Sequence, residues 1–237
     1  MASIKAFLGT CVLLAVFATP ALAEDKNWAG EAELGLVSTT GNTDTSSING
    51  KLKLKGDWGR WNGEFKAGYH WAEDSGETSA RRFTSSATAR YLVSEKGFVF
   101  GAIDYEDDGF NGFDYRLSES IGYGHRFDLS EDAFLVLSAG PGFRQNKTDE
   151  GEKTEETIIY GNLDFEWKIA DNVLFTEDFN LKSGEENTFM ESITAVKTAV
   201  ARNLALKLSY TVRNNSDVPD GRENTDTVTA ATIVYGF

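Results

Sequence analysis

Lysine recurs at every second position at Lys51, Lys53 and Lys55, and leucine fills the positions between. Because the side chains of a β-strand alternate between its two faces, this spacing predicts a cationic column on one face and an apolar surface on the other. A column of ammonium groups in contact with water attracts small anions, whereas the apolar face must be covered by protein or lipid. These residue types favour the binding or passage of solutes over covalent chemistry.

Further charged side chains alternate in the same way on other segments, and we expect them to line the interior of a closed sheet. The cations are Lys66, Arg82, Arg90, Arg116, Lys207 and Arg213, and the acids are Asp164, Glu166 and Asp178. Opposed basic and acidic walls would create a transverse field that orients small polar solutes. The same groups could instead form an interior salt-bridge network that fills the barrel and contributes only stability. The sequence leaves both interpretations open, because it does not say whether the two walls touch.

The sequence offers little that is typical of an enzyme. Its two histidines, His70 and His125, do not have the spacing of a metal-binding pair, and no Gly-x-Ser-x-Gly or phosphate-binding loop occurs. We therefore expect no catalytic, cofactor-binding or metal-binding residue, and a lipid-modifying outer-membrane enzyme is only a third alternative. The net charge of −14 repels nucleic acid and excludes it as a partner.

The charges must be positioned by strands, and twelve alternating segments can be drawn, each ended by clusters of Gly, Asn, Asp or Ser. An even number of strands with aromatic residues at both ends predicts an all-β fold, a transmembrane antiparallel up-and-down β-barrel. Glu119 and Glu177 fall on the expected lipid-facing side, unless a β-bulge in the glycine-rich sixth segment changes the parity. The segments are Trp28–Thr39, Thr45–Asp57, Trp61–Glu73, Arg81–Val93, Gly97–Glu106, Phe113–Phe127, Ala133–Gln145, Thr157–Ile169, Val173–Ser183, Phe189–Arg202, Leu204–Asn214 and Thr225–Phe237.

The first 23 residues have the features of a secretory signal peptide. Lys5 is followed by the apolar run Ala6–Phe17 and by the small-x-small site Ala21-Leu22-Ala23. We therefore expect a signal peptide at 1–23 and a barrel at 24–237, exported through the Sec pathway to the outer membrane of a Gram-negative bacterium. The expected partners there are outer-membrane lipid and lipopolysaccharide. Acidic residues of the outer loops could share divalent cations with lipopolysaccharide, although such loops are more often only solvated. These residues are Asp107, Asp108, Asp149, Glu150, Glu152, Glu155, Glu156, Glu185, Glu186, Asp217 and Asp220.

The two ends of the predicted barrel resemble a known family. Trp28-Ala29-Gly30-Glu31-Ala32-Glu33-Leu34-Gly35 is followed by Thr39-Thr40-Gly41-Asn42-Thr43-Asp44-Thr45, and the chain ends on Tyr235-Gly236-Phe237. These stretches resemble the YdiY-like family, described as salt-induced outer-membrane proteins. The resemblance implies an outer-membrane β-barrel whose activity is not established, and it supplies no catalytic residues.

Each of these stretches also has a physical interpretation. Gly41 and Asn42 can adopt the positive φ of a tight hairpin turn, and Thr43 can cap exposed backbone donors. A ligand site at this turn is the alternative. Tyr235 and Phe237 lie on one face of the last strand, and an aromatic at the end of such a strand resembles the signal that the barrel-assembly machinery recognises.

From these observations we expect a narrow diffusion channel for small polar or anionic solutes, and the family resemblance implies a link to salt or osmotic stress. The alternative is a non-conducting envelope barrel that supports the membrane through its acidic outer loops. The sequence does not indicate an oligomeric state.

Overall fold

The computed structural model describes residues 27–39, 45–108, 113–218 and 223–237. The expected signal peptide at 1–23 and the turn residues Gly41, Asn42 and Thr43 lie outside the described residues. Within the described part of the chain, no helix is long and apolar enough to cross a membrane.

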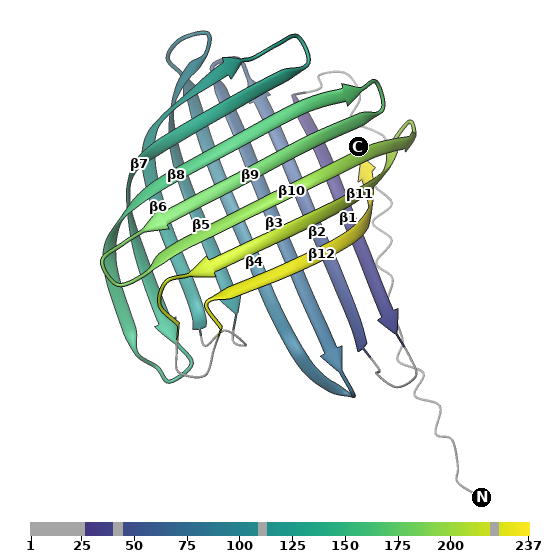
Figure 1. The fold of residues 1–237 in the computed structure, drawn as a ribbon. Helices are drawn as coiled ribbons and strands as arrows, with labels where there is room; N and C mark the ends of the chain where they lie inside the picture. Colours follow the sequence, from purple (N-terminus) through teal and green to yellow (C-terminus); the bar gives the residue numbers. More distant parts are fainter. Residues whose placement is uncertain (1–26, 40–44, 109–112, 219–222) are drawn as a thin grey trace, which may run out of the picture.

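The structure is a closed barrel of twelve strands (Figure 1), in which every neighbouring pair is antiparallel. The strands follow one another around the wall in chain order, and β1 closes the barrel against β12. The prediction of an up-and-down barrel is therefore confirmed. The strands are β1 (Trp28–Thr39), β2 (Thr45–Trp58), β3 (Trp61–Asp74), β4 (Glu77–Leu92), β5 (Gly97–Asp108), β6 (Phe113–Asp128), β7 (Ala133–Thr148), β8 (Lys153–Ala170), β9 (Val173–Ser183), β10 (Thr188–Ala201), β11 (Leu204–Asn215) and β12 (Thr225–Gly236).

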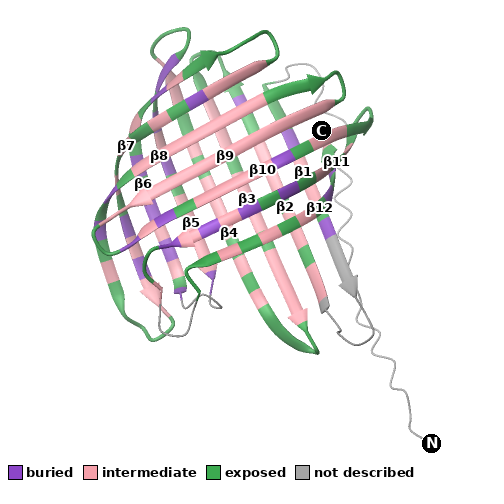
Figure 2. Ribbon diagram, viewed as in Figure 1, coloured by how far each residue is buried: buried purple, intermediate pink, exposed green. Residues whose placement is uncertain are grey.

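The alternation of side chains separates an apolar outer surface from a largely polar interior. On β11, Leu206 and Leu208 are exposed on the outside, while Ser209 and Thr211, which follow them at the alternate positions, are buried inside. The same alternation is visible as bands along the strands in Figure 2. An apolar outer face and a polar inner face are the inverse of a soluble β-sandwich, and they match the requirements of a barrel in lipid.

Aromatic side chains gather at both ends of the barrel. We call the end that carries Phe237 the inner end, since the sequence predicts that it faces the periplasm, and the opposite end the outer end. At the inner end the rings of Trp28 and Trp58 lie 4.7 Å apart. At the outer end those of Phe83 and Tyr105 lie 6.4 Å apart. Two such belts are typical of the two interfaces of a membrane.

Two connections at the outer end are shorter than the sequence predicts, because the strands continue further. The expected loop between the third and fourth segments is a turn at Ser75 and Gly76, whose φ angles are 53° and 85°. The loop expected at Asn146–Glu156 is likewise reduced, since β7 and β8 extend to Thr148 and from Lys153. The hairpins thus continue the barrel wall outwards through polar residues that do not show the alternating apolar pattern.

The two carboxylates expected to face lipid do so, and no bulge changes their parity. The irregularity of β6 lies between Phe113 and Tyr115, far from Glu119, which is exposed between the buried Ser118 and Ser120. Glu177 accepts hydrogen bonds from the hydroxyl groups of Ser192 and Thr194 at 2.6 and 2.5 Å. The hydrogen bonds from these hydroxyl groups reduce the free-energy cost of placing the Glu177 carboxylate on the lipid-facing side of the barrel.

The barrel closes along a short seam between β1 and β12. The registered pairs run only from Glu31 with Gly236 to Leu34 with Ile233. Beyond them, Gly30 and Phe237 exchange two backbone hydrogen bonds of 2.8 and 2.9 Å. A Cβ atom on Gly30 would lie 2.3 Å from Cε2 of Phe237, so the terminal ring packs directly on this glycine. Closure therefore depends on a residue without a side chain at position 30.

Replacing Gly30 by valine should destabilise the barrel by roughly 1 to 3 kcal/mol, the usual cost of forcing extra volume into a packed contact. The ring of Phe237 would have to leave its position over the seam. The measurement is the temperature at which the fast-migrating folded band converts to the unfolded band on a detergent gel. Gly50→Val is the matched control, because a Cβ there meets nothing within 4 Å. Equal conversion temperatures for the two variants would show that this contact does not contribute to closure.

Candidate functional site

The registers place all of the predicted charges on the inner face of the barrel. Lys53 lies opposite Lys66, and Lys55 lies opposite Glu64, while the leucines between the lysines face outwards. The same alternation turns the remaining predicted charges inwards, on β3, β4, β6, β8, β9 and β11: Lys66, Arg82, Arg90, Arg116, Asp164, Glu166, Asp178, Lys207 and Arg213. The lumen is therefore strongly charged along its whole length.

The lysine column of β2 (Lys51, Lys53 and Lys55) is accompanied by a carboxylate that the sequence analysis did not select. Glu64 on β3 lies 3.4 Å from the Lys53 ammonium, 3.9 Å from that of Lys55 and 3.1 Å from that of Lys66. Glu64 lies at an alternate position from Lys66, and therefore on the same inward face of its strand, which was the signal that could have identified it. The side chains of Lys53, Lys55 and Lys66 nevertheless remain 35%, 53% and 39% exposed, respectively. Water thus reaches the lysine column inside the barrel.

Ion pairs cross the lumen and connect the basic wall to the acidic wall. Lys66 on β3 lies 3.4 Å from Asp178 on β9. Arg90 on β4 lies 3.7 Å from Asp164 on β8. Both pairs join strands that are far apart around the barrel, so the two predicted walls do touch. A further crossing, between Lys182 and Asp104 at 3.1 Å, joins β9 to β5 and was not anticipated.

The outer end of the lumen contains a dense cluster of paired charges, which we call the outer ion-pair network (Arg82, Glu106, Asp108, Arg116, Glu191 and Arg213). Arg213 lies at its centre: it donates a short hydrogen bond to Glu106 and lies 3.6 Å from Asp108 and 2.9 Å from Glu191. Its side chain is only 3% exposed. Glu191 lies on the neighbouring strand β10, whereas Glu106 and Asp108 lie on β5, so Arg213 on β11 links opposite parts of the wall.

Two more arginines complete this network. Arg116 lies 3.2 Å from Glu106 and its guanidinium lies 4.0 Å from the ring centre of Phe113, while Arg82 lies 3.9 Å from Asp108. The sequence predicts that Asp108 lies in a solvated acidic loop. This prediction is wrong, because Asp108 is buried. Polar composition near a strand end does not distinguish a solvated carboxylate from one paired with an arginine on another strand.

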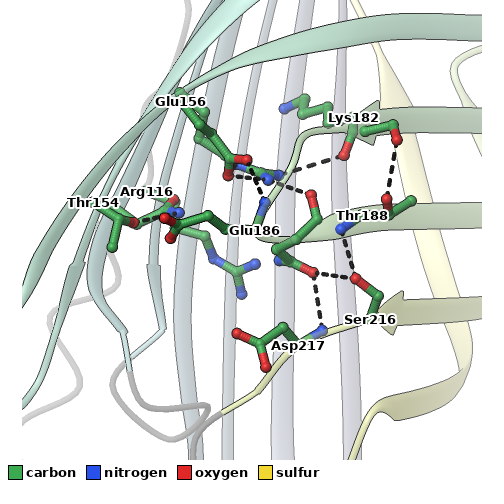
Figure 3. Close-up of polar contacts among 12 residues, drawn as sticks. Arg116, Thr154, Glu156, Lys182, Glu186, Thr188, Ser216 and Asp217 are labelled. Carbon is green, nitrogen blue, oxygen red and sulfur yellow. Dashed lines mark hydrogen bonds and ion pairs between the residues drawn. The ribbon is translucent and has the colours of Figure 1, made fainter.

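A second polar cluster ties the outer connections together (Figure 3), and we call it the loop clamp (Arg144, Glu156, Asn187, Asn215 and Ser216). Arg144 donates to Glu156 through Nε and Nη2 at 3.0 and 2.5 Å, and Nη2 also donates to the carbonyl of Asn187 at 2.5 Å. The other oxygen of Glu156 accepts from the Glu186 amide at 3.0 Å. The connection between β9 and β10 is thereby fixed to the inside of β7 and β8.

Asn187 extends the loop clamp to the next connection. Its side-chain amide donates to Asn215 at 3.2 Å, and its side-chain oxygen accepts from the Ser216 hydroxyl and the Asp217 amide, both at 3.2 Å. Asn215 also accepts a hydrogen bond of 2.6 Å from Arg116, so the loop clamp and the outer ion-pair network are continuous. The expectation that Glu156 belongs to a merely solvated loop is wrong, because this carboxylate is buried.

Part of the inner wall is apolar, which the sequence analysis did not predict. Phe98, Phe100, Ala102 and Val136 form a buried cluster, and the ring of Tyr160 packs on Phe100 with centroids 5.4 Å apart. The fifth segment is apolar on both faces at its start, and this was the available signal. The cluster lies on the part of the inner wall formed by β5, β7 and β8, away from the lysine column of β2.

Open cavities border the lumen at the inner end. One of about 440 Å³ is lined by Lys55, Glu64, Arg90, Asp57 and Arg126, among others. Another of about 330 Å³ lies against Glu31, Lys197 and Phe237 at the seam. Charged groups of both signs thus face solvent at the inner end, whereas the charges at the outer end are buried. Among the described residues, no group of three or more His, Cys, Asp or Glu side chains is arranged to hold a metal ion.

Comparisons with known proteins agree with this architecture. The COG4313 outer membrane channel from Pseudomonas putida F1 superposes with a TM-score of 0.54 at 12% identity, over 89% of this chain and 94% of that one. The NanC porin gives 0.50 at 10% identity, over 88% and 97%. The translocator domain of the autotransporter NalP from Neisseria meningitidis gives 0.50 at 11% identity, over 91% and 89%. At such identities the likeness shows a shared fold, that of bacterial outer-membrane barrels.

Sequence comparison supplies the family. The uncharacterized protein YdiY of Escherichia coli (strain K12) is 26% identical over 218 residues, which cover 90% of this chain and 84% of that protein. The resemblance to the YdiY-like family is therefore confirmed. The model of the family described as "Protein of unknown function, DUF481" matches residues 32–237, which include nearly the whole barrel. The chain is thus a member of the DUF481 family.

Proposed function

We propose that this barrel is a narrow outer-membrane channel for small polar or anionic solutes, whose passage follows the lysine column. The observation that carries the proposal is the contrast in exposure along the lumen. Lys53, Lys55 and Lys66 are 35% to 53% exposed although they lie on the inner face of the wall. An interior that only stabilised the barrel would leave little water around these ammonium groups.

Among the described residues, the outer end of the lumen is occupied by buried side chains that are paired with one another. They belong to the outer ion-pair network and the loop clamp, and they include Arg213 and Arg144. Conduction then requires rearrangement of side chains or of the connection around Asn187. This accounts for a gated rather than a permanently open channel. Two of the solved barrels that share the fold are named as a porin and as an outer membrane channel, which supports the proposal.

The direct test is electrical recording from the purified, folded protein in a planar lipid bilayer. We expect small, discrete conductance steps with intermittent closures, and a preference for anions over cations. Protein unfolded by heating before its addition is the control, since it has the same composition without the barrel. Absence of any step from protein that shows the folded band on a detergent gel would contradict the channel proposal.

A non-conducting barrel is the second candidate, and the pairs that cross the lumen favour it. Lys66 with Asp178 and Lys182 with Asp104 brace opposite parts of the wall and narrow the interior. Such a barrel would support the envelope during osmotic or salt stress. It would give no conductance, while its loss from cells would still reduce survival after a salt upshift.

We further propose that the chain reaches the outer membrane through the Sec pathway, with Tyr235 and Phe237 engaging the assembly machinery. Both rings face outwards and lie 6.2 Å apart on the closing strand, where a partner can contact them. Outer-membrane lipid would then surround the wall and lipopolysaccharide its outer belt. We expect no enzymatic activity.

A further inference from the structure

One inward-facing lysine differs from the others because it has no carboxylate partner. Among the described residues, the Lys51 ammonium makes neither an ion pair nor a hydrogen bond, whereas six other inward lysines each lie within 3.9 Å of a carboxylate oxygen: Lys53, Lys55, Lys66, Lys182, Lys197 and Lys207. Lys51 is exposed to the lumen, so its ammonium is open to an ion that arrives from solution. Lys51 therefore offers an uncompensated positive charge midway along β2.

The carboxylates whose charges act on Lys51 are already engaged. They are Glu33, which lies 2.8 Å from the Lys207 ammonium, and Glu191, which lies 2.9 Å from Nε of Arg213. The cations Lys207 and Arg82 also act on Lys51 and repel it. Neither carboxylate is therefore reserved for Lys51, whose ammonium remains available to an anion from solution.

His70 lies beside Lys51, and one of its two ring nitrogens, Nδ1, is buried without a hydrogen-bond partner among the described residues. His70 lies on β3 and pairs with Asn49 of β2 on one side and with Arg82 of β4 on the other. Lys51 follows Asn49 by two positions, on the same face of β2. A buried ring nitrogen without a partner is destabilising, and an oxyanion that accepts a hydrogen bond from a ring N–H would remove this cost.

The wall next to Lys51 is also kept free of a side chain. Gly68 lies directly opposite Lys51, and a Cβ atom there would stand 2.8 Å from Oγ1 of Thr84 and 4.0 Å from Cγ of Lys51. The glycine thus leaves room between the lysine stem and a hydroxyl group that can donate a hydrogen bond. Arg82 approaches a carboxylate only at 3.9 Å, so part of its guanidinium is also available.

We propose that Lys51, His70 and Arg82 form an oxyanion site midway along the lumen, which holds the carboxylate or phosphate group of a small solute. The arrangement supplies an ammonium, a ring N–H and a guanidinium, the groups that bind oxyanions through charge-assisted hydrogen bonds. The inference rests on the proposed channel function and names the class of solute that the channel selects. Binding at this site can be measured without any conduction.

The two histidines of the chain make a direct test possible. Folded protein labelled with carbon-13 at the histidine rings is titrated in detergent with inorganic phosphate, and separately with acetate, at constant pH and ionic strength. We expect a saturable shift of the His70 resonance. His125 is the internal reference, because it lies outside the lumen near the inner end, with its ring 4.7 Å from that of Phe127.

Lys51→Gln should weaken the oxyanion affinity by about tenfold or more, the effect expected when one charge-assisted hydrogen bond is lost. Because Lys51 has no carboxylate partner, this variant leaves no carboxylate unpaired and should fold. Lys197→Gln is the control at another inward lysine, which lies 2.6 Å from Glu31 near the inner end and outside the lysine column, and it should retain the wild-type affinity. Saturation by both anions indicates an oxyanion site for either class, whereas saturation by phosphate alone assigns it to phosphate.

Three outcomes would overturn the oxyanion site: no saturable shift of His70, equal shifts of His70 and His125, or equal weakening by the two lysine variants. The channel proposal is judged separately by the bilayer recordings. Conductance without a saturable His70 shift would support the channel proposal and contradict the oxyanion site. A saturable His70 shift without conductance would support the oxyanion site and contradict the channel proposal.

Discussion

Replacing Arg213 by glutamine should lower the free energy of unfolding by about 3 kcal/mol or more, as is typical when one partner of a buried ion pair is removed. Arg213 is 3% exposed and contacts Glu106, Asp108 and Glu191. Glutamine retains some hydrogen bonding but no charge, so these carboxylates repel one another inside the barrel. The measurement is urea unfolding of the folded protein in lipid vesicles.

The matched control is Arg126→Gln at the inner end. Arg126 is also paired, with Asp128 at 2.7 Å, but its side chain is largely solvated, and an exposed pair contributes only about 0 to 1 kcal/mol. If the channel proposal is correct, Arg213→Gln should also conduct more often than the wild type, because the pairing at the outer end is weakened. Equal stability of the two variants would show that the outer ion-pair network does not hold the outer end together.

Replacing Lys51, Lys53 and Lys55 together by glutamate should reverse the ion preference of the channel. The column would change from three positive to three negative charges along the side of the lumen that water reaches. Rings and columns of fixed charge set the sign of the ions that a pore admits. The measurement is the reversal potential under a salt gradient, which should change sign.

The corresponding triple glutamine variant is the control for this prediction. It removes the cations without adding new repulsion toward Glu64, so it should weaken the anion preference without inverting it. Folding of both variants is checked by their mobility on a detergent gel before heating. An unchanged reversal potential in both would mean that the lysine column does not line the passage.

The strands and their faces could be predicted because they depend on local alternation. β1 and β9 have the predicted bounds, and every predicted interior charge lies on the inner face. The largest errors are at the outer ends of β4 and β8, which begin at Glu77 and Lys153. The outer ends of these strands are polar on both faces because the hairpins extend beyond the apolar belt. No alternation of apolar and polar residues therefore marks them as strand.

One strand showed that alternation by itself can be ambiguous. β10 carries aliphatic residues on both faces, and the sequence did not indicate which side faces lipid. The structure turns Ala195 inwards, where it is buried, and leaves Val196 and Val200 exposed outside. The choice follows from the register with β9 and β11, which sets Ala195 beside Thr176 and Ser209. A neighbouring strand with a clear pattern imposes its orientation on an ambiguous one.

By itself the sequence determined the number of strands, their faces and the inward charges, because side-chain alternation is a property of each strand alone. Only the tertiary structure decided which of those charges meet. Lys66 with Asp178 and Arg213 with Glu106 are more than a hundred positions apart in the chain. Their contact depends on the closure, tilt and stagger of the whole barrel, which no single strand encodes. Among the described residues, the unpartnered state of Lys51 likewise appears only once the partners of the neighbouring inward lysines are known.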